Sequence, residues 1–295
     1  YIEGDNKVKY YAQELKQNTY NLTRMNLVMR GIEADNIVTR NGDTLEDDWP
    51  YFDENDPTGT YNPLYVDAVV SNPPYSQAWN PTDKETDPRY AGYGLAPKGK
   101  ADYAFLLHDL YHIKPDGIMT IVLPHGVLFR GGEEGEIRKN IINADLVDCI
   151  VAMPTQLFYT TQIPVSLWFL AKNKKQKGKT LFIDARKLGT MVTRKLRELT
   201  DEDIKKIADT YNAFVDGTLE DEKGFCAVVT TQDIAEQDYI LTPGRYVGIE
   251  EQEDDGEPFE EKMGRLTSEL SELFAKSHEL EAQIKERLGA IGYEI

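Results

Sequence analysis

Short apolar runs and amphipathic segments alternate along most of this chain, and this alternation restricts its fold more than any other feature. The runs with the length of buried strands are 7–15, 36–39, 66–71, 118–123, 146–153, 165–171 and 180–183. The segments with apolar residues at helical spacing are 19–31, 102–113 and 134–142. Strands that alternate with helices are typical of an α/β domain, so the sequence predicts a core built on a parallel sheet.

The pattern changes past about residue 190. Thr200 is followed by three acidic residues, which predicts a helix over 201–214 with Thr200 as its N-cap. An acidic, hinge-like stretch then occupies 250–261. We expect three parts: an α/β domain, a small accessory region, and a hinge with a C-terminal helix, at 1–190, 191–249 and 250–295.

The last helix carries apolar residues at alternating steps of three and four. These residues are Met263, Leu266, Leu270, Leu273, Leu280, Ile284 and Ile291. Ser277 and Arg287 occupy the two remaining positions of the seam. The spacing is that of a coiled coil, and the alternative is a helix that packs back on its own domain. The narrow seam and its charged flanks favour pairing with another long helix.

Composition restricts the classes of partner and compartment. The chain has 51 acidic and 33 basic residues and a net charge of −18, so it repels phosphates on average. Binding to nucleic acid therefore requires a local basic patch or a basic partner. No apolar run reaches the ~18 to 20 residues that a bilayer span needs. The two cysteines lie in apolar contexts, which excludes a disulfide scaffold and favours the cytoplasm.

The most informative motif is Asn72-Pro73-Pro74-Tyr75, which directly follows the strand predicted at 66–71. Ligands of open α/β sheets bind outside the carboxyl ends of the strands. The Asn72 side-chain oxygen and the Pro73 carbonyl can accept the two protons of an exocyclic amine, and Tyr75 can stack on its ring. This arrangement suits methylation of such a nitrogen, which is otherwise a poor nucleophile. The alternative is a proline turn that only ends a strand.

Further segments give this motif a specific context. They are Gln13-Glu14, Thr19-Tyr20, Arg24-Met25-Asn26-Leu27, Gly42-Asp43-Thr44-Leu45, Lys100-Ala101-Asp102-Tyr103-Ala104-Phe105, residues 123–132, Ile137-Arg138-Lys139, residues 157–164 and Ile183-Asp184-Ala185-Arg186. In this order, together with Asn72–Tyr75, they resemble the methylation subunit of type I restriction–modification systems, an adenine-N6 DNA methyltransferase family. The resemblance implies a Rossmann-like methyltransferase sheet, with S-adenosylmethionine as the methyl donor and Asn72, Pro73, Pro74 and Tyr75 as the catalytic set.

The resemblance also implies cofactor-binding residues. Glu14 matches the acidic residue that holds the ribose hydroxyls, and Asp43 matches the one near the adenine of the cofactor, with Asn72 beside them. A carboxylate can accept from both hydroxyls of a diol. From local sequence alone, Glu14 also fits a solvated strand end, and Asp43 fits an ordinary Asx turn beside Gly42.

One part of the family pattern is not present. A glycine-rich loop after the first strand should precede Glu14, but only Gly4 lies upstream. We therefore expect that this chain is a C-terminal portion that lacks the N-terminal domain and first strand. The family's sheet places that strand between those ending at Glu14 and Ser71. We expect the chain alone to bind the cofactor weakly.

The sequence contains two other candidate sites, a pair of histidines and a lysine-rich run. His108 and His112 lie one helical turn apart around Asp109, as in the His-Glu-x-x-His helix of zinc proteases. The acid is one methylene shorter and no third ligand motif follows, so core or capping histidines are favoured and no metal is expected. A dense basic run can either contact DNA phosphate or form a solvated turn, which is favoured. Its residues are Lys172, Lys174, Lys175, Lys177 and Lys179.

The resemblance implies double-stranded DNA as substrate, a DNA-specificity subunit as partner and often a restriction subunit as well. The residues expected to dock to the specificity subunit are Met263, Leu266, Leu270, Leu273, Leu280 and Ile284. Two rival functions stay open: methyl transfer to a protein glutamine, and an assembly-only subunit that works through its coiled coil.

Overall fold

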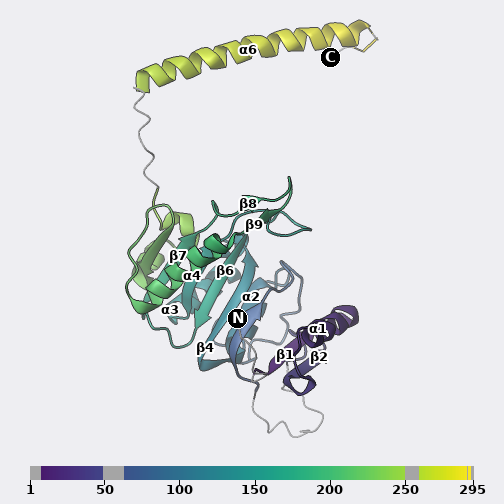
Figure 1. The fold of residues 1–295 in the computed structure, drawn as a ribbon, viewed down its shortest axis with the longest axis vertical. Helices are drawn as coiled ribbons and strands as arrows, with labels where there is room; N and C mark the ends of the chain where they lie inside the picture. Colours follow the sequence, from purple (N-terminus) through teal and green to yellow (C-terminus); the bar gives the residue numbers. More distant parts are fainter. Residues whose placement is uncertain (1–7, 49–62, 250–258, 291, 294–295) are drawn as a thin grey trace. The chain divides into compact units, whose positions relative to one another are not determined.

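The computed structural model describes residues 8–48, 63–249, 259–290 and 292–293. The chain forms two compact units, residues 1–250 and 251–295. The first unit holds every strand of the described residues, and the second holds one long helix (Figure 1).

The first unit begins with a small βαβ element. β1 (Tyr10–Glu14) and β2 (Ile37–Asn41) pair in parallel, and α1 (Gln17–Met29) and a 3-10 turn (Ala34–Asn36) connect them. The six-stranded sheet that follows has the order β10-β7-β5-β6-β4-β3. Its strands are β3 (Val66–Ser71), β4 (Ile113–Pro124), β5 (Val147–Ala152), β6 (Val165–Ala171), β7 (Lys179–Asp184) and β10 (Cys226–Thr230).

The remaining elements of this unit connect or cover these strands. They are α2 (Asp102–His112), α3 (Glu133–Asn143), α4 (Asp201–Asp216), α5 (Thr231–Glu236), the hairpin strands β8 (Thr190–Met191) and β9 (Arg197–Glu198), and 3-10 turns at His125–Leu128 and Pro243–Arg245. The predicted cap of α4 is confirmed, since Thr200 and Asp203 form a capping box.

The prediction of a purely parallel sheet is wrong. β3, β4, β5 and β7 run in the same direction, but β6 lies antiparallel between β4 and β5, and β10 lies antiparallel to β7. The reason lies in the connections, because residues 153–164 join β5 to β6 without a helix. An adjacent parallel strand is usually reached through a crossover that contains a helix. The carboxyl ends of β3, β4, β5 and β7 still meet at one edge.

The segment 114–117 lies before the strand predicted at 118–123. β4 instead begins at Ile113 and runs through it, with an irregular register opposite Val66 and Ala68. A Cβ atom on Gly117 would lie 2.9 Å from the Asp67 carbonyl oxygen, so glycine allows the two strands to approach.

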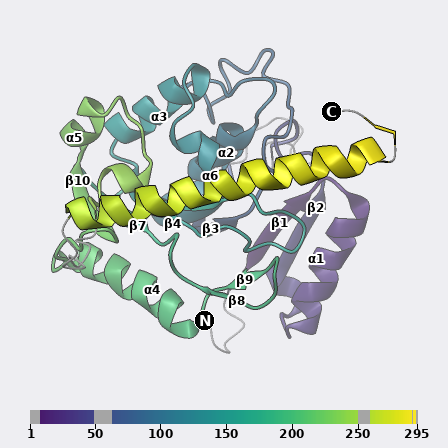
Figure 2. The same ribbon diagram turned by 90° about the horizontal axis from the view of Figure 1, so that it is seen from above.

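The sheet separates two apolar clusters. Ile150 of β5 packs with residues of α2 and α3, whereas its neighbour Val151 packs with Phe214 of α4 on the other face. Figure 2 shows α2 and α3 on one side of the strands and α4 on the other. This layering holds the carboxyl ends of the parallel strands in a rigid frame.

One end of the unit has open surfaces. Within the described ranges, β1 is paired with β2 alone and β3 with β4 alone, so each strand has an unpaired edge. No residue of α1 is buried, and its apolar residues Met25, Val28 and Met29 are exposed. Strand edges and apolar helix faces of this kind are normally covered in a folded protein.

The second unit is α6 (Phe259–Ala290), a helix of 32 residues. None of its residues is buried, and the seam residues Leu270 and Leu273 are 50% and 57% exposed. The predicted seam residue Ile291 lies outside the described residues. In the described parts of the chain, no helix has the length and hydropathy needed to cross a membrane.

Candidate functional site

The Asn72–Tyr75 tetrapeptide lies at the carboxyl end of β3, as predicted. Asn72 is exposed, Pro73 is buried and Tyr75 is partly buried. The Tyr75 hydroxyl donates a hydrogen bond of 2.7 Å to Oδ1 of Asn72. This internal bond was not predicted. An amide oxygen has two lone pairs, so Asn72 keeps one acceptor position for a ligand.

The Tyr75 ring is less free than the sequence suggested. It packs against the apolar cluster on the α4 side of the sheet, and it meets Phe158 edge-on with ring centroids 6.3 Å apart. Burial raises the pKa of Tyr75, which keeps its hydroxyl protonated as a donor. Tyr75 therefore offers part of its face for stacking. Its aromatic neighbour Phe158 lies in the segment 157–164 of the resemblance, but no role was predicted for it.

Ser76, directly after the tetrapeptide, has a left-handed backbone with φ of +50°. Its N–H donates a hydrogen bond of 2.7 Å to Oδ1 of Asp102. Asp102 is fully buried at the first turn of α2, and its other oxygen accepts from Arg130 at 3.3 Å. A non-glycine residue adopts this conformation only when its surroundings hold it. Asp102 thus fixes the exit of the chain from Tyr75.

Arg130 is itself held in place. Its Nε lies 3.2 Å from a carboxylate oxygen of Glu134, which is buried. A Cβ atom on Gly126 would come within 2.7 Å of the Arg130 guanidinium, so glycine leaves room for that side chain. The buried Arg138 donates to the carbonyl of Arg130 at 2.8 Å. The turn after β4 therefore carries the cation that orients Asp102.

Glu14 and Asp43 lie near each other at the carboxyl ends of β1 and β2. Glu14 faces Asn41 in the parallel register, and the Gly42 N–H donates to the Glu14 carbonyl oxygen at 3.2 Å. The Glu14 carboxylate accepts from the Lys16 N–H at 3.0 Å. Asp43 accepts from the Leu45 N–H at 3.0 Å, which is the contact of an Asx turn.

Arg89 joins the loop after β2 to the loop that follows the tetrapeptide. Its guanidinium donates to the carbonyl oxygens of Thr44 and Leu45 at 3.0 and 3.3 Å. It also forms an ion pair of 2.7 Å with Asp87. The structure therefore ties the Asp43 loop to the segment that follows Tyr75, although Arg89 carried no signal in the sequence.

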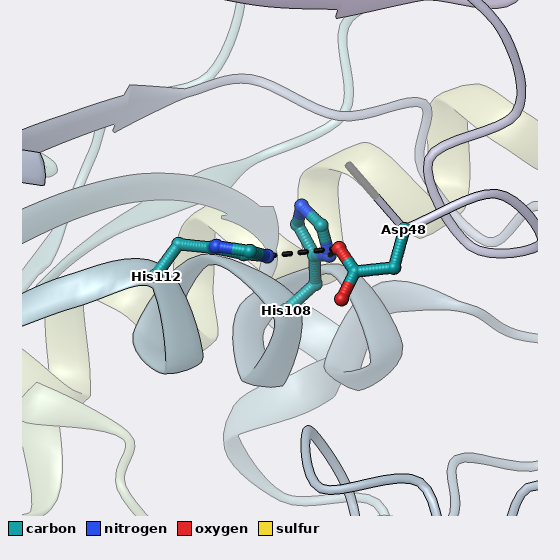
Figure 3. A group of neighbouring side chains, drawn as sticks. All are labelled: Asp48, His108 and His112. Atoms are coloured by element: carbon teal, nitrogen blue, oxygen red, sulfur yellow. Dashed lines mark hydrogen bonds and ion pairs between the residues drawn. The ribbon is translucent and has the colours of Figure 1, made fainter. Parts of the chain in front are cut away.

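The two histidines of α2 are closer to a metal-binding arrangement than the sequence indicated. Asp48 supplies a third group, and one candidate ligand atom from each of Asp48, His108 and His112 lies within 4.8 Å of the others (Figure 3). His112 places Nε2 2.9 Å from the Asp48 carboxylate and Nδ1 2.7 Å from the Leu64 carbonyl oxygen. The second contact is typical of a ligating histidine.

Arg89 argues against a metal at this cluster. Its Nη1 lies 3.2 Å from Nδ1 of His108, and its Nε lies 3.7 Å from Asp48. An arginine only donates, so Nδ1 of His108 must accept that proton. Burial, His112 and Arg89 together lower the pKa of His108 well below its ordinary value. A fixed guanidinium already neutralises Asp48, so we assign the cluster as a network that anchors the loop after β2 to α2.

The basic run between β6 and β7 is largely structural. Lys172 donates to the carbonyl oxygens of Tyr111 and Ile113, at the end of α2. The buried Lys174 forms an ion pair of 2.6 Å with Asp145. The run also lies at the amino ends of the parallel strands, opposite Asn72. These contacts favour a turn between two strands over a DNA contact, although the buried Lys174 is not solvated as predicted.

Comparison with known proteins agrees with the resemblance found in the sequence. Residues 2–255 match the model of the N-6 DNA methylase family. The chain belongs to this family. It is 47% identical over 294 residues to the HindI methylase subunit of a type I restriction enzyme from Haemophilus influenzae, over 98% of this chain and 63% of that protein. It is 41% identical to the MjaIX methylase subunit from Methanocaldococcus jannaschii, over 98% of this chain and 51% of that one.

Solved structures give the same result. The crystal structure of a type I restriction–modification methyltransferase subunit from Streptococcus thermophilus is 40% identical, with a TM-score of 0.75 over 83% of this chain and 49% of that chain. The EcoKI M protein, at 20% identity and a TM-score of 0.61, shares the fold. The predicted family and the methyltransferase fold class are confirmed. The chain spans about half to two thirds of the length of these relatives.

Proposed function

We propose that this chain carries the base-binding part of an S-adenosylmethionine-dependent DNA adenine-N6 methyltransferase, as the modification subunit of a type I restriction–modification complex. The observation that carries the proposal is the exposed Asn72 amide at the carboxyl end of β3, with Tyr75 bonded to it at 2.7 Å. Relatives described as type I methylase subunits support it.

In this proposal the chain binds an adenine extruded from the duplex. The free lone pair of Asn72 Oδ1 and the Pro73 carbonyl accept the two protons of the exocyclic amine, which keeps the nitrogen lone pair directed away from the ring. Tyr75, supported by Phe158, contacts the base. Asp102 holds Ser76 and so limits the movement of this loop. Because the charge develops on the nitrogen next to fixed acceptors, no titrating base is required.

The acidic residues fit the cofactor that the family implies. S-adenosylmethionine, when bound, supplies the methyl group. Glu14 retains acceptor capacity for two ribose hydroxyls after accepting from Lys16, because a carboxylate has about four lone-pair positions. Asp43 lies in a loop that Arg89 fixes to the segment after Tyr75. Glu14, Asp43 and Asn72 would therefore hold the cofactor along one edge of the unit.

The open edges of β1 and β3 support a further part of the proposal. The family places a strand and a glycine-rich loop between the strands ending at Glu14 and Ser71, and no described strand lies there. Such a strand would pair with both edges. We propose that the cofactor site is complete only when it is present.

The charge and α6 support a partner. A net charge of −18 opposes binding to duplex DNA, so a specificity subunit would supply the sequence readout and much of the affinity. The exposed seam of α6, which includes Leu266, Leu270 and Leu273, is the proposed docking surface for long helices of that subunit. A restriction subunit would join the same complex. The two free cysteines fit a cytoplasmic enzyme.

The test measures the transfer of a labelled methyl group from S-adenosylmethionine to duplex DNA. The enzyme is the full-length subunit assembled with its partners. Label in N6-methyladenine is expected. Label on a protein glutamine would favour the rival methyltransferase, and a stable complex that transfers no label would favour the assembly-only subunit. Matched DNA whose target adenines already carry the methyl group is the control.

A further inference from the structure

A second group of basic residues lies in a part of the chain that the sequence analysis did not single out. Residues 186–197 contain five basic and no acidic side chains. The basic residues are Arg186, Lys187, Arg194, Lys195 and Arg197. In a chain with a net charge of −18, this is a local reversal of sign. The segment forms the β8–β9 hairpin and the turn that leads into it.

The hairpin lies at the end of the sheet where the parallel strands have their carboxyl ends, which is also the end that carries Asn72. It follows β7, which is parallel to β5. β5 and β4 are both antiparallel to β6, and β4 is parallel to β3, so β3, β5 and β7 run in the same direction. The carboxyl end of β7 therefore lies at the same edge as Asn72. Figure 1 shows the hairpin projecting beyond the end of the sheet.

Contacts tie the hairpin to the loop beside Tyr75. The Arg197 N–H donates to the Gln156 carbonyl oxygen at 2.8 Å, and the Gln156 side chain donates to the Arg194 carbonyl oxygen at 3.4 Å. Two residues further on, Phe158 meets the Tyr75 ring. The loop between β5 and β6 thus contacts both the hairpin, through Gln156, and Tyr75, through Phe158.

The tip of the hairpin has a defined shape. The Val192 N–H donates to the Leu196 carbonyl oxygen at 2.9 Å, and the Leu196 N–H donates to the Thr193 hydroxyl at 3.0 Å. The Leu196 side chain is buried and anchors the tip. Arg194 and Lys195 lie between these contacts, so their backbone positions are fixed.

The basic side chains of the hairpin differ in what they are free to bind. Arg186 pairs with Asp184 at 2.5 Å, and Arg197 donates to the carbonyl oxygens of Leu188 and Gly189. Arg194 and Lys195 are exposed and make no ion pair with any residue that the structure describes. Two cations at a fixed tip are therefore available to an external anion.

We propose that Arg194 and Lys195 bind backbone phosphates of the duplex that flanks the extruded adenine. The proposal rests on the proposed DNA methyltransferase function. Charge complementarity supports this partner, because closely spaced phosphates surround any extruded base and the tip is a positive surface attached to the loop beside Tyr75. The contact would set the register of the duplex on an otherwise acidic subunit.

The test compares two matched pairs of substitutions in the full-length subunit assembled with its partners. The tip pair is Arg194→Ala with Lys195→Ala. The control pair is Lys175→Ala with Lys177→Ala, two exposed lysines at the opposite edge of the sheet. DNA affinity is measured by fluorescence anisotropy across a salt series. The slope of log K against log salt is negative, and the tip pair is expected to reduce its magnitude by about 1.8, since each lost phosphate contact removes about 0.9.

The control pair is expected to leave the slope unchanged, and Arg194→Lys with Lys195→Arg is expected to retain it. An unchanged slope for the tip pair, or an equal fall for both pairs, would overturn the proposal. Loss of co-purification with the partner subunit at an unchanged slope would also overturn it and assign the tip to an acidic protein surface. A wild-type complex that transfers no methyl group, yet shows the tip-dependent slope, would reject the proposed function and not the phosphate contact.

Discussion

Replacing Asp102 with alanine should destabilise the first unit strongly, because two groups, the Ser76 N–H and the Arg130 guanidinium, depend on one buried carboxylate. Asp102 is 0% exposed, accepts from the Ser76 N–H at 2.7 Å and pairs with Arg130 at 3.3 Å. An unsatisfied buried N–H costs about 1 to 3 kcal/mol, and because Ser76 is exposed its share lies at the lower end of that range. Removing one partner of a buried ion pair costs about 3 to 5 kcal/mol. Arg130 is 20% exposed and keeps Glu134, so its share falls below that range.

We therefore expect Asp102→Ala to lower the free energy of unfolding by about 3 kcal/mol, measured by urea denaturation of the chain. Asp102→Asn keeps an oxygen acceptor for Ser76 but presents an amide to Arg130, so its loss should be smaller. Ser76→Gly relieves a left-handed backbone that costs about 1 kcal/mol and should change stability little. A loss below about 1 kcal/mol for Asp102→Ala, equal to that of Asp102→Asn, would refute the role given to this carboxylate.

Three further predictions concern other parts of the chain. Burial raises the pKa of Asp109 to about 7, so the folded state keeps a proton that the unfolded state releases. The contribution of Asp109 to stability should therefore fall by about 3 kcal/mol as pH rises from 4 to 7, and Asp109→Asn should remove this contribution from a pH series of urea midpoints. Leu270→Asp with Leu273→Asp should abolish co-purification with the specificity subunit and leave unfolding of the first unit unchanged, whereas Ser268→Asp, off the seam, should keep the complex. Calorimetry should show weak S-adenosylmethionine binding by this chain and tight binding by the full-length subunit; equal affinities would contradict the proposed role of the strand between β1 and β3.

Local patterns in the sequence were sufficient for most strands and helices as far as α4, but β8, β9, β10 and α5 were not predicted. The apolar runs at 66–71 and 165–171 correspond to β3 and β6, and Thr200 caps α4 as its acidic followers indicated. The alternation of strands and helices did not reveal that β6 and β10 are antiparallel, because strand direction depends on the connections. β4 begins at Ile113, before the predicted run 118–123, because pairing with β3 outweighs the turn propensity of Pro115 and Gly117.

In the candidate site, too, local sequence predicted some residues, whereas others depend on contacts between distant parts of the chain. Asn72 and Tyr75 could be chosen as candidates because four consecutive residues carry the pattern. Asp102 and Arg89 were not, since each acts on groups far away in the sequence: Asp102 on Ser76, and Arg89 on Thr44. The bond between Tyr75 and Asn72 was missed as well, because it depends on side-chain direction at a chain reversal.

The central claim is that Asn72 supplies an acceptor to the amine that is methylated. The most direct measurement is the single-turnover rate of methyl transfer to duplex DNA by the full-length complex carrying Asn72→Ala, with cofactor and DNA affinities measured on the same preparation. The rate should fall by about 10²- to 10³-fold while both affinities stay close to those of the unsubstituted complex. Transfer at the unsubstituted rate would contradict the account.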